Sequence, residues 1–444
     1  MCGLSYTIGK NNIEKMNETL RHRGIRSSYK KLNDNDLYLG HTRLPIQGVD
    51  KRYDQPSVYG NYTAAMVGEL FNFRAMDPSA RTDLSVLMDQ YSMNGSNVFM
   101  NFDGFWSVII YNEFTGYTDI FTDHLAKKPL YYRTDLCAFA SEIKALTVLG
   151  ENTFDKTYFS AVAKWGYCPE DRTPFSEIKK LPGGAHIQLN SMGYVINSKS
   201  YLSLLPSPSA SLELIMEDAV RNRLVSDVPV SLLMSGGLDS TIIYYLMRKH
   251  TDSMTIFHID NDEAEYLNYI DFRPQDKLIS LSIDDTLYDT DEVLWHNDGP
   301  VDLGSLMPQY LLAKEIKKHG FNVCLSGDGA DELFGGYKRI TEYDSQYSDI
   351  FHELAYYHLP RLDKMMMAHT IELRSPFLAH YVIEHALSMK YEDRINKIGL
   401  KEAFKHIVPE EIVNRKKKPL RYRTDWRHDL IKQYKDLIIK RGLV

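Results

Sequence analysis

The sequence has 444 residues, of which 43% are hydrophobic and 25% charged, and its formal net charge is -7 at pH 7. This length suits two domains better than one core, and the composition is typical of a compact soluble protein rather than a disordered one. The charge is spread along the chain, so we expect no nucleic-acid partner. No apolar run reaches the ~18 to 20 residues that a membrane helix needs, and no signal-peptide pattern is present, so we expect no membrane association and a cytoplasmic location.

The first half of the chain is predicted to form stacked β-sheets flanked by helices. A stretch rich in Pro and Ser, residues 206–211, is the expected linker before an amphipathic segment at 212–224. We therefore predict two domains, residues 2–205 and 206–444. The runs with a strand pattern are 37–39, 64–66, 106–111, 138–140 and 186–189.

Cys2 directly follows the initiator methionine. Removal of Met1 would leave a thiol and a free α-amine on one residue, and the amine, with an unperturbed pKa of ~7.7 to 8, can act as the general base for the thiol. The other three cysteines are widely spaced and suggest neither a disulfide framework nor a zinc site. Taken alone, a cysteine at this position is more often accidental, so its assignment depends on the motifs that follow.

Four motifs after Cys2 occur in a fixed order, RHRG at 21–24, HTRLPI at 41–46, GELFN at 68–72 and TD at 82–83. Together with Cys2 they resemble the motifs of class II glutamine amidotransferase domains, which have an Ntn-type αββα sandwich. The resemblance implies that Cys2 attacks the glutamine side-chain amide. It also implies that Arg43 holds the α-carboxylate, Asp83 the α-ammonium, and that the Gly68 N–H stabilises the oxyanion beside Glu69. Taken singly, Arg43 or Asp83 would be better explained by a surface ion pair.

Val67 departs from this pattern. The family usually has Asn before the Gly-Glu pair, and that side-chain amide is the second donor to the oxyanion. A lost oxyanion donor typically lowers the rate by a factor on the order of 10² to 10³. Glutaminase activity is therefore expected to be weak, rebuilt by another donor, or absent.

In the second half, the apolar run 228–234 is followed by SGGLDS at 235–240 and then by apolar residues at helical spacing. This pattern predicts a buried parallel strand that turns into a helix at the glycines. A helix N-terminus preceded by glycines suits a phosphate, although a plain glycine-rich turn is the alternative. The motif is not a Walker loop; it is similar to the SGGxDS loop of ATP pyrophosphatases, which grip pyrophosphate and release AMP.

A second apolar run, 322–325, leads into SGDGADELFGGY at 326–337, with three acids within five positions. Such a cluster needs a cation, for which Mg²⁺ is suited, and a solvated acidic loop is the alternative. With the first loop it resembles the synthetase domain of asparagine synthetases and β-lactam synthetases, a doubly wound parallel-sheet fold of the α/β class.

The resemblance implies a role for each loop residue. Asp239 and Asp331 would hold Mg²⁺ and pyrophosphate, and Asp328, where asparagine synthetases often carry Glu, would lie near the activated carboxylate. The phosphates would be cradled by Ser235, Gly236, Gly237 and Ser240, and the adenine framed by Leu233, Ile259 and the backbone of Ser326 and Gly327.

Three later strings extend the resemblance. Residues 371–378 resemble EVRxPFLD, with Ala379 in place of the final Asp, and 397–401 resemble KxxLR, with Lys401 in place of Arg. Residues 415–417 match RxK, which implies that Lys417 contacts the phosphates and stabilises the charge that develops in the transition state. A solvated helix end is the alternative for this basic run.

The resemblance over both halves implies a glutamine-dependent asparagine synthetase. ATP and Mg²⁺ would activate aspartate as β-aspartyl-AMP, and ammonia from glutamine hydrolysis at Cys2 would give asparagine, AMP and pyrophosphate. The expected partners are the small-molecule substrates glutamine, aspartate and ATP, and the family implies a homodimer. The alternatives are a synthetase that uses free ammonia, one that amidates another carboxylate, and a degenerate glutamine- or nucleotide-binding module with a regulatory role.

Overall fold

The structure is a computed structural model that describes residues 2–202, 204–207, 210–260, 264–281, 289–301, 303–337, 349–415 and 427–444. Its N-terminal half contains two six-stranded antiparallel sheets. The first has the order β10 (Ile178–Lys180), β8 (Tyr131–Arg133), β9 (Ala138–Ala140), β1 (Gly3–Ile8), β3 (Leu37–Arg43) and β2 (Arg26–Lys31). The second has the order β12 (Val195–Ser200), β11 (Ala185–Leu189), β7 (Thr118–Thr122), β6 (Gly104–Asn112), β5 (Tyr62–Leu70) and β4 (Ser57–Tyr59).

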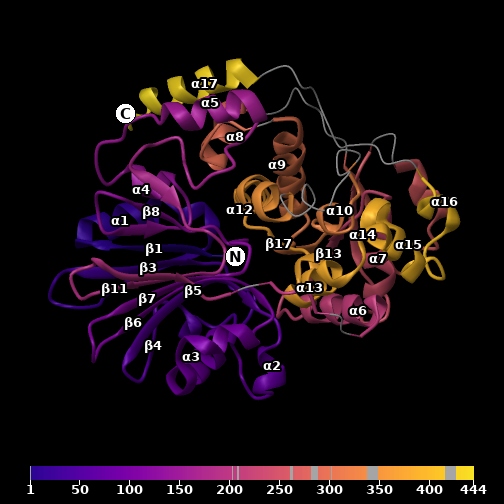
Figure 1. Ribbon diagram of the computed structural model, residues 1–444, viewed down its shortest axis with the longest axis horizontal. Helices are drawn as coiled ribbons and strands as arrows, with labels where there is room; N and C mark the ends of the chain where they lie inside the picture. The colour runs from indigo at the N-terminus through magenta and orange to yellow at the C-terminus, as the bar shows by residue number, and fades with distance from the viewer. Residues whose placement is uncertain are drawn as a thin grey trace.

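The two antiparallel sheets stack on one another with helices outside (Figure 1). One apolar cluster joins their inner faces and includes Leu4, Val67 and Ile109. Helices α1 (Lys10–Thr19), α4 (Lys144–Thr147) and α5 (Lys156–Trp165) lie on the side of the first sheet, and α2 (Phe73–Met76) and α3 (Asp83–Asn94) on the side of the second. The predicted αββα sandwich is confirmed.

The C-terminal half is built on a parallel sheet of five strands. Their order is β15 (Lys277–Leu281), β14 (Thr255–Ile259), β13 (Val230–Leu233), β16 (Val323–Leu325) and β17 (Glu372–Arg374). The chain leaves β13 from the sheet centre and returns to its neighbour β16, so the two loops that follow these strands lie side by side. The predicted parallel-sheet fold is confirmed.

Helices surround this sheet, and most of them share one large apolar core with it. They are α6 (Leu212–Arg223), α7 (Leu238–Met247), α8 (Thr290–Asn297), α9 (Leu303–Lys318), α10 (Ala330–Leu333), α12 (Leu359–Met367), α13 (His380–Ser388), α14 (Tyr391–Arg394), α15 (Ile398–Phe404), α16 (Glu410–Val413) and α17 (Arg427–Lys440), with the π-helical segment η5 (Asp349–His358) before α12. In the part of the chain that the structure describes, no helix has the length and hydrophobicity needed to cross a membrane.

The two halves meet along α12 and α17. Tyr434 and Leu437 of α17 join the apolar cluster of Phe159 in α5, and the two helices run side by side (Figure 1). On α12, Asp363 accepts from Arg23 at 2.8 Å and from Lys128 at 2.8 Å. Because the C-terminal helix returns to the first half, the division near residue 205 stays a prediction.

Candidate active sites

Cys2 lies at the entrance to β1, the strand that pairs with both β9 and β3 in the first sheet. Its Sγ is 3.9 Å from the carbonyl oxygen of Leu44, and its own carbonyl accepts from Arg23 Nε at 2.9 Å. Burial raises the pKa of the Cys2 thiol, which Arg43 opposes in part. The cysteine is therefore fixed in position, and its thiol needs a base to form the nucleophilic thiolate.

Gly68 and Val67 lie on β5 of the second sheet. Gly68 has φ 122° and its Cα faces the backbone of Phe105 on β6, so no other residue fits there without displacing the strand. Val67 is 1% exposed and belongs to the inter-sheet cluster against which Cys2 packs. The position that carries Asn in the resembling domains is thus filled by an apolar side chain that cannot donate a hydrogen bond.

Arg43, at the end of β3, is held by the loop that follows it. Its guanidinium donates to the carbonyls of Gln47 at 2.8 Å and Gly48 at 2.6 Å, and to the Asp54 carboxylate at 2.8 Å. A bond to the Asp50 carbonyl adds a fourth contact at 3.2 Å. The predicted carboxylate ligand is therefore already engaged by its own chain, and a bound carboxylate would have to replace some of these acceptors.

The two predicted acidic ligands of glutamine are buried close together. Glu69 accepts a hydrogen bond from Gln47 Nε2, and burial, with Glu372 second, raises its pKa well above the usual range. Asp83 begins α3 and accepts from the backbone N–H of Leu70 at 2.9 Å. Burial raises the pKa of Asp83 to about 6. The sequence did not point to Gln47. Its buried side-chain amide donates to the Glu69 carboxylate, which is the acceptor that an ammonium or amide group of the substrate would need.

The first loop of the C-terminal half has the predicted strand, turn and helix. β13 ends at Leu233, Gly236 takes φ 70°, and α7 begins at Leu238. Ser240 Oγ lies 3.2 Å from the Ser235 N–H and donates to the Gly237 carbonyl at 3.2 Å, which closes the turn. The residues predicted to cradle phosphate thus form one tight loop at a helix N-terminus.

The second loop touches the first. A Cβ on Gly327 would lie 2.8 Å from the Asp239 Cβ, so glycine permits this close approach. Ser326 Oγ donates to Asp328 Oδ2 at 2.5 Å, which turns the Asp328 carboxylate back onto its own loop. Leu233 and Ile259 end the neighbouring strands β13 and β14 on the same edge of the sheet. The structure therefore brings the predicted nucleotide residues together at the carboxyl ends of the strands.

Lys397 joins the two predicted metal ligands. Its Nζ lies 2.6 Å from Asp239 Oδ2 and 2.6 Å from Asp331 Oδ1. Burial disfavours its charge, but the two carboxylates prevail and raise the pKa of Lys397 above its usual value. The sequence placed Lys397 in a motif but gave it no role. The three acids of the second loop need a cation, and that need could have indicated a lysine partner.

Asp239 and Asp331 converge on one cation, so their oxygen donors fit Mg²⁺ chemically. Among the described residues no group of three or more His, Cys, Asp or Glu side chains could hold a metal ion. Two carboxylates alone leave most of an octahedral shell to phosphate oxygens and water. Lys417 lies outside the described residues, but Arg415 of the same motif donates to the Gly236 carbonyl at 2.9 Å.

The string at 371–378 lies between the two sites. Arg374 on β17 is fully buried, donates to Glu372 at 2.6 Å, and reaches the carbonyls of Arg223 at 2.8 Å and Val225 at 2.7 Å. Burial disfavours the charge of Glu372, but Arg374 lowers its pKa below the usual value. Because Glu372 in turn raises the pKa of Glu69, strand β17 connects the parallel sheet electrostatically to the Cys2 site.

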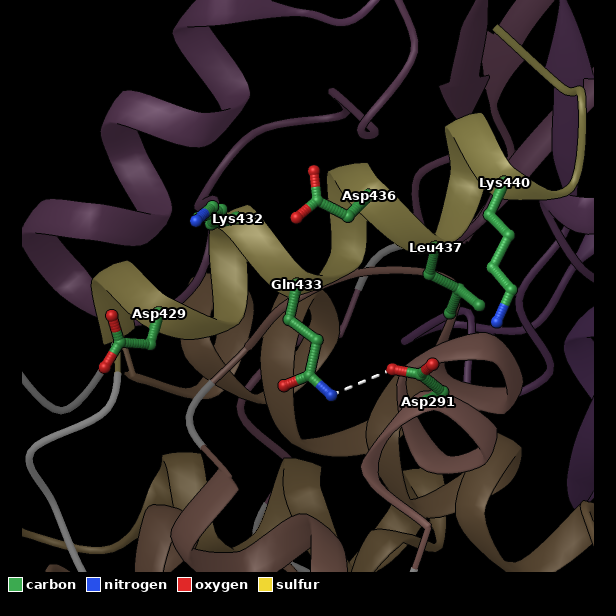
Figure 2. A pocket seen from close by; sticks show the side chains of 7 residues that line it. All are labelled: Asp291, Asp429, Lys432, Gln433, Asp436, Leu437 and Lys440. Carbon is green, nitrogen blue, oxygen red and sulfur yellow. Dashed lines mark hydrogen bonds between the residues drawn. The ribbon is translucent and has the colours of Figure 1, made fainter.

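A hollow of about 380 Å³ lies between α17 and α8 (Figure 2). Gln433 donates to Asp291 across it at 2.8 Å (Figure 2), and the charged side chains that α17 contributes to its lining are exposed. None of the residues predicted from the sequence lines it. This hollow is therefore not part of either candidate site.

Comparisons with known proteins find family matches for both halves of the chain. The family model "Asparagine synthase" matches residues 211–353 and 341–443, and the model "Glutamine amidotransferase domain" matches residues 1–202. An asparagine synthetase [glutamine-hydrolyzing] 1 of Bacillus subtilis is 28% identical over 360 residues, 74% of this chain and 56% of the relative. A putative asparagine synthetase [glutamine-hydrolyzing] 2 of Methanocaldococcus jannaschii is 27% identical over 391 residues, 76% of each chain.

The chain thus aligns with little more than half the length of the Bacillus relative. Among solved structures, a glutamine phosphoribosylpyrophosphate amidotransferase from B. subtilis is 13% identical and covers 74% of this chain and 81% of its own, with a TM-score of 0.35, a likeness too weak to support an inference. The family models together span both halves, and the matched segments contain the Cys2 motifs and the two phosphate-type loops. The chain belongs to the asparagine synthase family.

Proposed function

We propose that the protein is an ATP-dependent carbon-nitrogen ligase that converts aspartate to asparagine through β-aspartyl-AMP. The observation that carries this proposal is the meeting of Asp239 and Asp331 on the Lys397 ammonium, at the carboxyl ends of two adjacent parallel strands. This edge of a parallel sheet is where such folds bind ligands. The names of the relatives, which are asparagine synthetases, support aspartate as the acceptor.

In this proposal the first loop and Ser240 bind the pyrophosphate part of ATP, with adenine against Leu233 and Ile259 and the backbone of Ser326 and Gly327. Mg²⁺, when bound at Asp239 and Asp331, neutralises phosphate charge, and Lys397 and Lys417 add fixed positive charge where pyrophosphate departs. The Asp328 carboxylate lies on the second loop, where it can orient the acceptor. Activation gives the carboxylate a leaving group, and exclusion of water protects the mixed anhydride.

We propose that glutamine supplies the nitrogen, with Cys2 as the nucleophile and Arg43, Glu69 and Asp83 as ligands of the substrate. In this proposal ammonia passes from the Cys2 site to the second site within the protein. The two halves are in contact between the sites, where Glu69 and Glu372 interact electrostatically. A homodimer is the oligomeric state that the family suggests, and it stays a prediction.

A second candidate is a synthetase that uses free ammonia, and three observations favour it. Val67 supplies no oxyanion donor, Gln47 occupies Glu69, and the loop carbonyls occupy Arg43. The experiment that separates the two candidates measures pyrophosphate release with Mg²⁺, ATP and a panel of carboxylates, each with glutamine or ammonium. Release with aspartate and either donor supports the first candidate, release with ammonium alone supports the second, and no release with any carboxylate contradicts both.

A further inference from the structure

A second cavity lies at the interface between the two halves, and its lining includes none of the residues of either candidate site. It measures about 60 Å³, which is roughly four to six times the ~10 to 15 Å³ that one water needs. The N-terminal half contributes the end of β10, and the C-terminal half contributes α12 and the segment that precedes it. Its charged lining consists of Arg172, Lys180, Arg361 and Lys364 with Glu170 and Asp298.

The basic side chains of this cavity outnumber the acidic ones, and two of them have carboxylate partners. Arg172 pairs with Asp155 at 2.9 Å and with Glu170 at 2.9 Å. Lys364 pairs with Asp298 at 3.1 Å, a carboxylate that Lys144 already contacts at 2.8 Å. Both acids of the lining are therefore already engaged by cations.

Lys180 and Arg361 have no carboxylate partner among the described residues. Lys180 is 5% exposed, and its Nζ donates to the backbone carbonyl of Ala355. Arg361 is 7% exposed; its Nη1 contacts the hydroxyls of Ser305 and Tyr357, its Nη2 lies 3.2 Å from His358 Nδ1, and its buried Nε has no hydrogen-bond partner. Two cationic side chains from opposite halves thus line one small cavity, and the Nε–H of Arg361 is a buried donor without a partner.

A buried charge without a counter-ion is costly, and the protein can avoid that cost by losing the proton or by binding an anion. Burial, with Lys364 second, lowers the pKa of Lys180 to about 7. Arg361 cannot take this route because a guanidinium stays protonated in proteins. A small anion would supply the missing negative charge for both side chains, since it would accept hydrogen bonds from the Arg361 guanidinium and from the Lys180 ammonium.

We propose that this cavity binds a small oxyanion of the phosphate class, held between Lys180 of the N-terminal half and Arg361 of the C-terminal half. A tetrahedral oxyanion matches the size of the cavity, whereas a nucleotide does not fit. Phosphate suits the donors present because a planar guanidinium and an ammonium both bind its oxygens strongly. The bound anion joins the two halves without contact with either candidate active site.

Equilibrium dialysis with labelled inorganic phosphate, at an ionic strength fixed with chloride, tests the proposal. Any phosphate that binds at the glycine-rich loop should bind equally to all variants, so a site weakened only in Lys180→Gln is the cavity. We expect this variant to weaken binding at one site per chain by about tenfold or more. The matched control is Lys179→Gln, because Lys179 is on the opposite face of β10 and does not line the cavity. Its ion pair with Asp171 is long at 3.9 Å, so the loss of this pair should have little effect. It should bind like the wild type.

Equal binding by Lys180→Gln and the wild type would overturn the proposal. Pyrophosphate as competitor distinguishes the source: displacement of the label from this site identifies the reaction product as an occupant, and no displacement identifies free phosphate. Should Lys180→Gln fail to fold, crystals of the wild type grown in phosphate and in chloride decide. Tetrahedral density between Lys180 and Arg361 only in phosphate supports the proposal, and its absence overturns it.

Discussion

Replacement of Lys397 by methionine removes the ammonium between Asp239 and Asp331 and keeps most of the side-chain volume. Because the two carboxylates raise the pKa of Lys397, the group is charged at neutral pH. Its contribution to stability is fully present below the unfolded-state pKa of ~10.4 and is lost only as the pH rises through the higher folded value. The variant therefore leaves two close carboxylates without their cation at any pH near 7.

Removal of one partner from a buried ion pair typically destabilises a protein by about 3 to 5 kcal/mol. The two aspartate side chains are 20% and 19% exposed, so water screens them in part. We therefore expect the free energy of unfolding to fall by about 3 kcal/mol, the lower end of this range. With an unfolding entropy of about 2.1 cal/mol/K per residue, Tm should fall by about 3 °C if the whole chain unfolds together, and by about 6 °C if the C-terminal half unfolds alone.

Differential scanning calorimetry with and without MgCl₂ measures this loss. Mg²⁺ should restore much of the Tm of Lys397→Met, because the cation takes the place of the ammonium, and should change the wild type less. The control is Lys405→Met at the end of α15, since Lys405 and its partner Glu402 are 61% and 65% exposed. The reasoning is refuted if Lys397→Met melts like the wild type, or if Mg²⁺ stabilises both proteins equally.

Three further predictions concern the Cys2 site. Cys2→Ala should abolish AMP release driven by glutamine and leave that driven by ammonium within about twofold, because only the former needs the thiol; loss of both would contradict the assignment. Val67→Asn should raise glutamate release toward the factor of about 10² that an oxyanion donor contributes, and an unchanged rate in a folded variant would show that residue 67 is not the limiting donor. Since the pKa of Asp83 is about 6, its carboxylate is lost below that pH, and KM for glutamine should rise about tenfold per pH unit there. The ammonium-driven reaction, compared at constant free ammonia, should lack this rise; an equal rise in both would place the titration elsewhere.

Local patterns were sufficient to predict most of the fold. The runs at 138–140 and 186–189 coincide with β9 and β11, and the apolar run before SGGLDS is β13. The sequence did not single out β1 as a strand, although it lies at the centre of its sheet. Its Ser5 is buried and donates to Asn17 of α1 at 2.6 Å, and a polar residue buried by such a bond cannot be told from an exposed one by pattern alone.

Contacts between residues distant in the sequence account for the rest of the candidate sites. Lys397 binds Asp239, which is 158 residues away in the sequence. The folded structure is therefore needed to identify its acidic partners. Gln47 contacts Glu69 because the loop after β3 packs against β5. No sequence motif predicts this contact. The cavity between Lys180 and Arg361 depends in the same way on how the two halves pack.

The most direct test of the central claim follows oxygen from the acceptor. Aspartate labelled with heavy oxygen in its side-chain carboxylate is incubated with the protein, Mg²⁺, ATP and ammonium, and AMP is analysed by mass spectrometry. If the carboxylate is activated as an acyl-adenylate, one labelled oxygen appears in AMP and asparagine keeps the other. Asparagine formed together with unlabelled AMP, or with ADP and phosphate in place of AMP and pyrophosphate, would contradict the account.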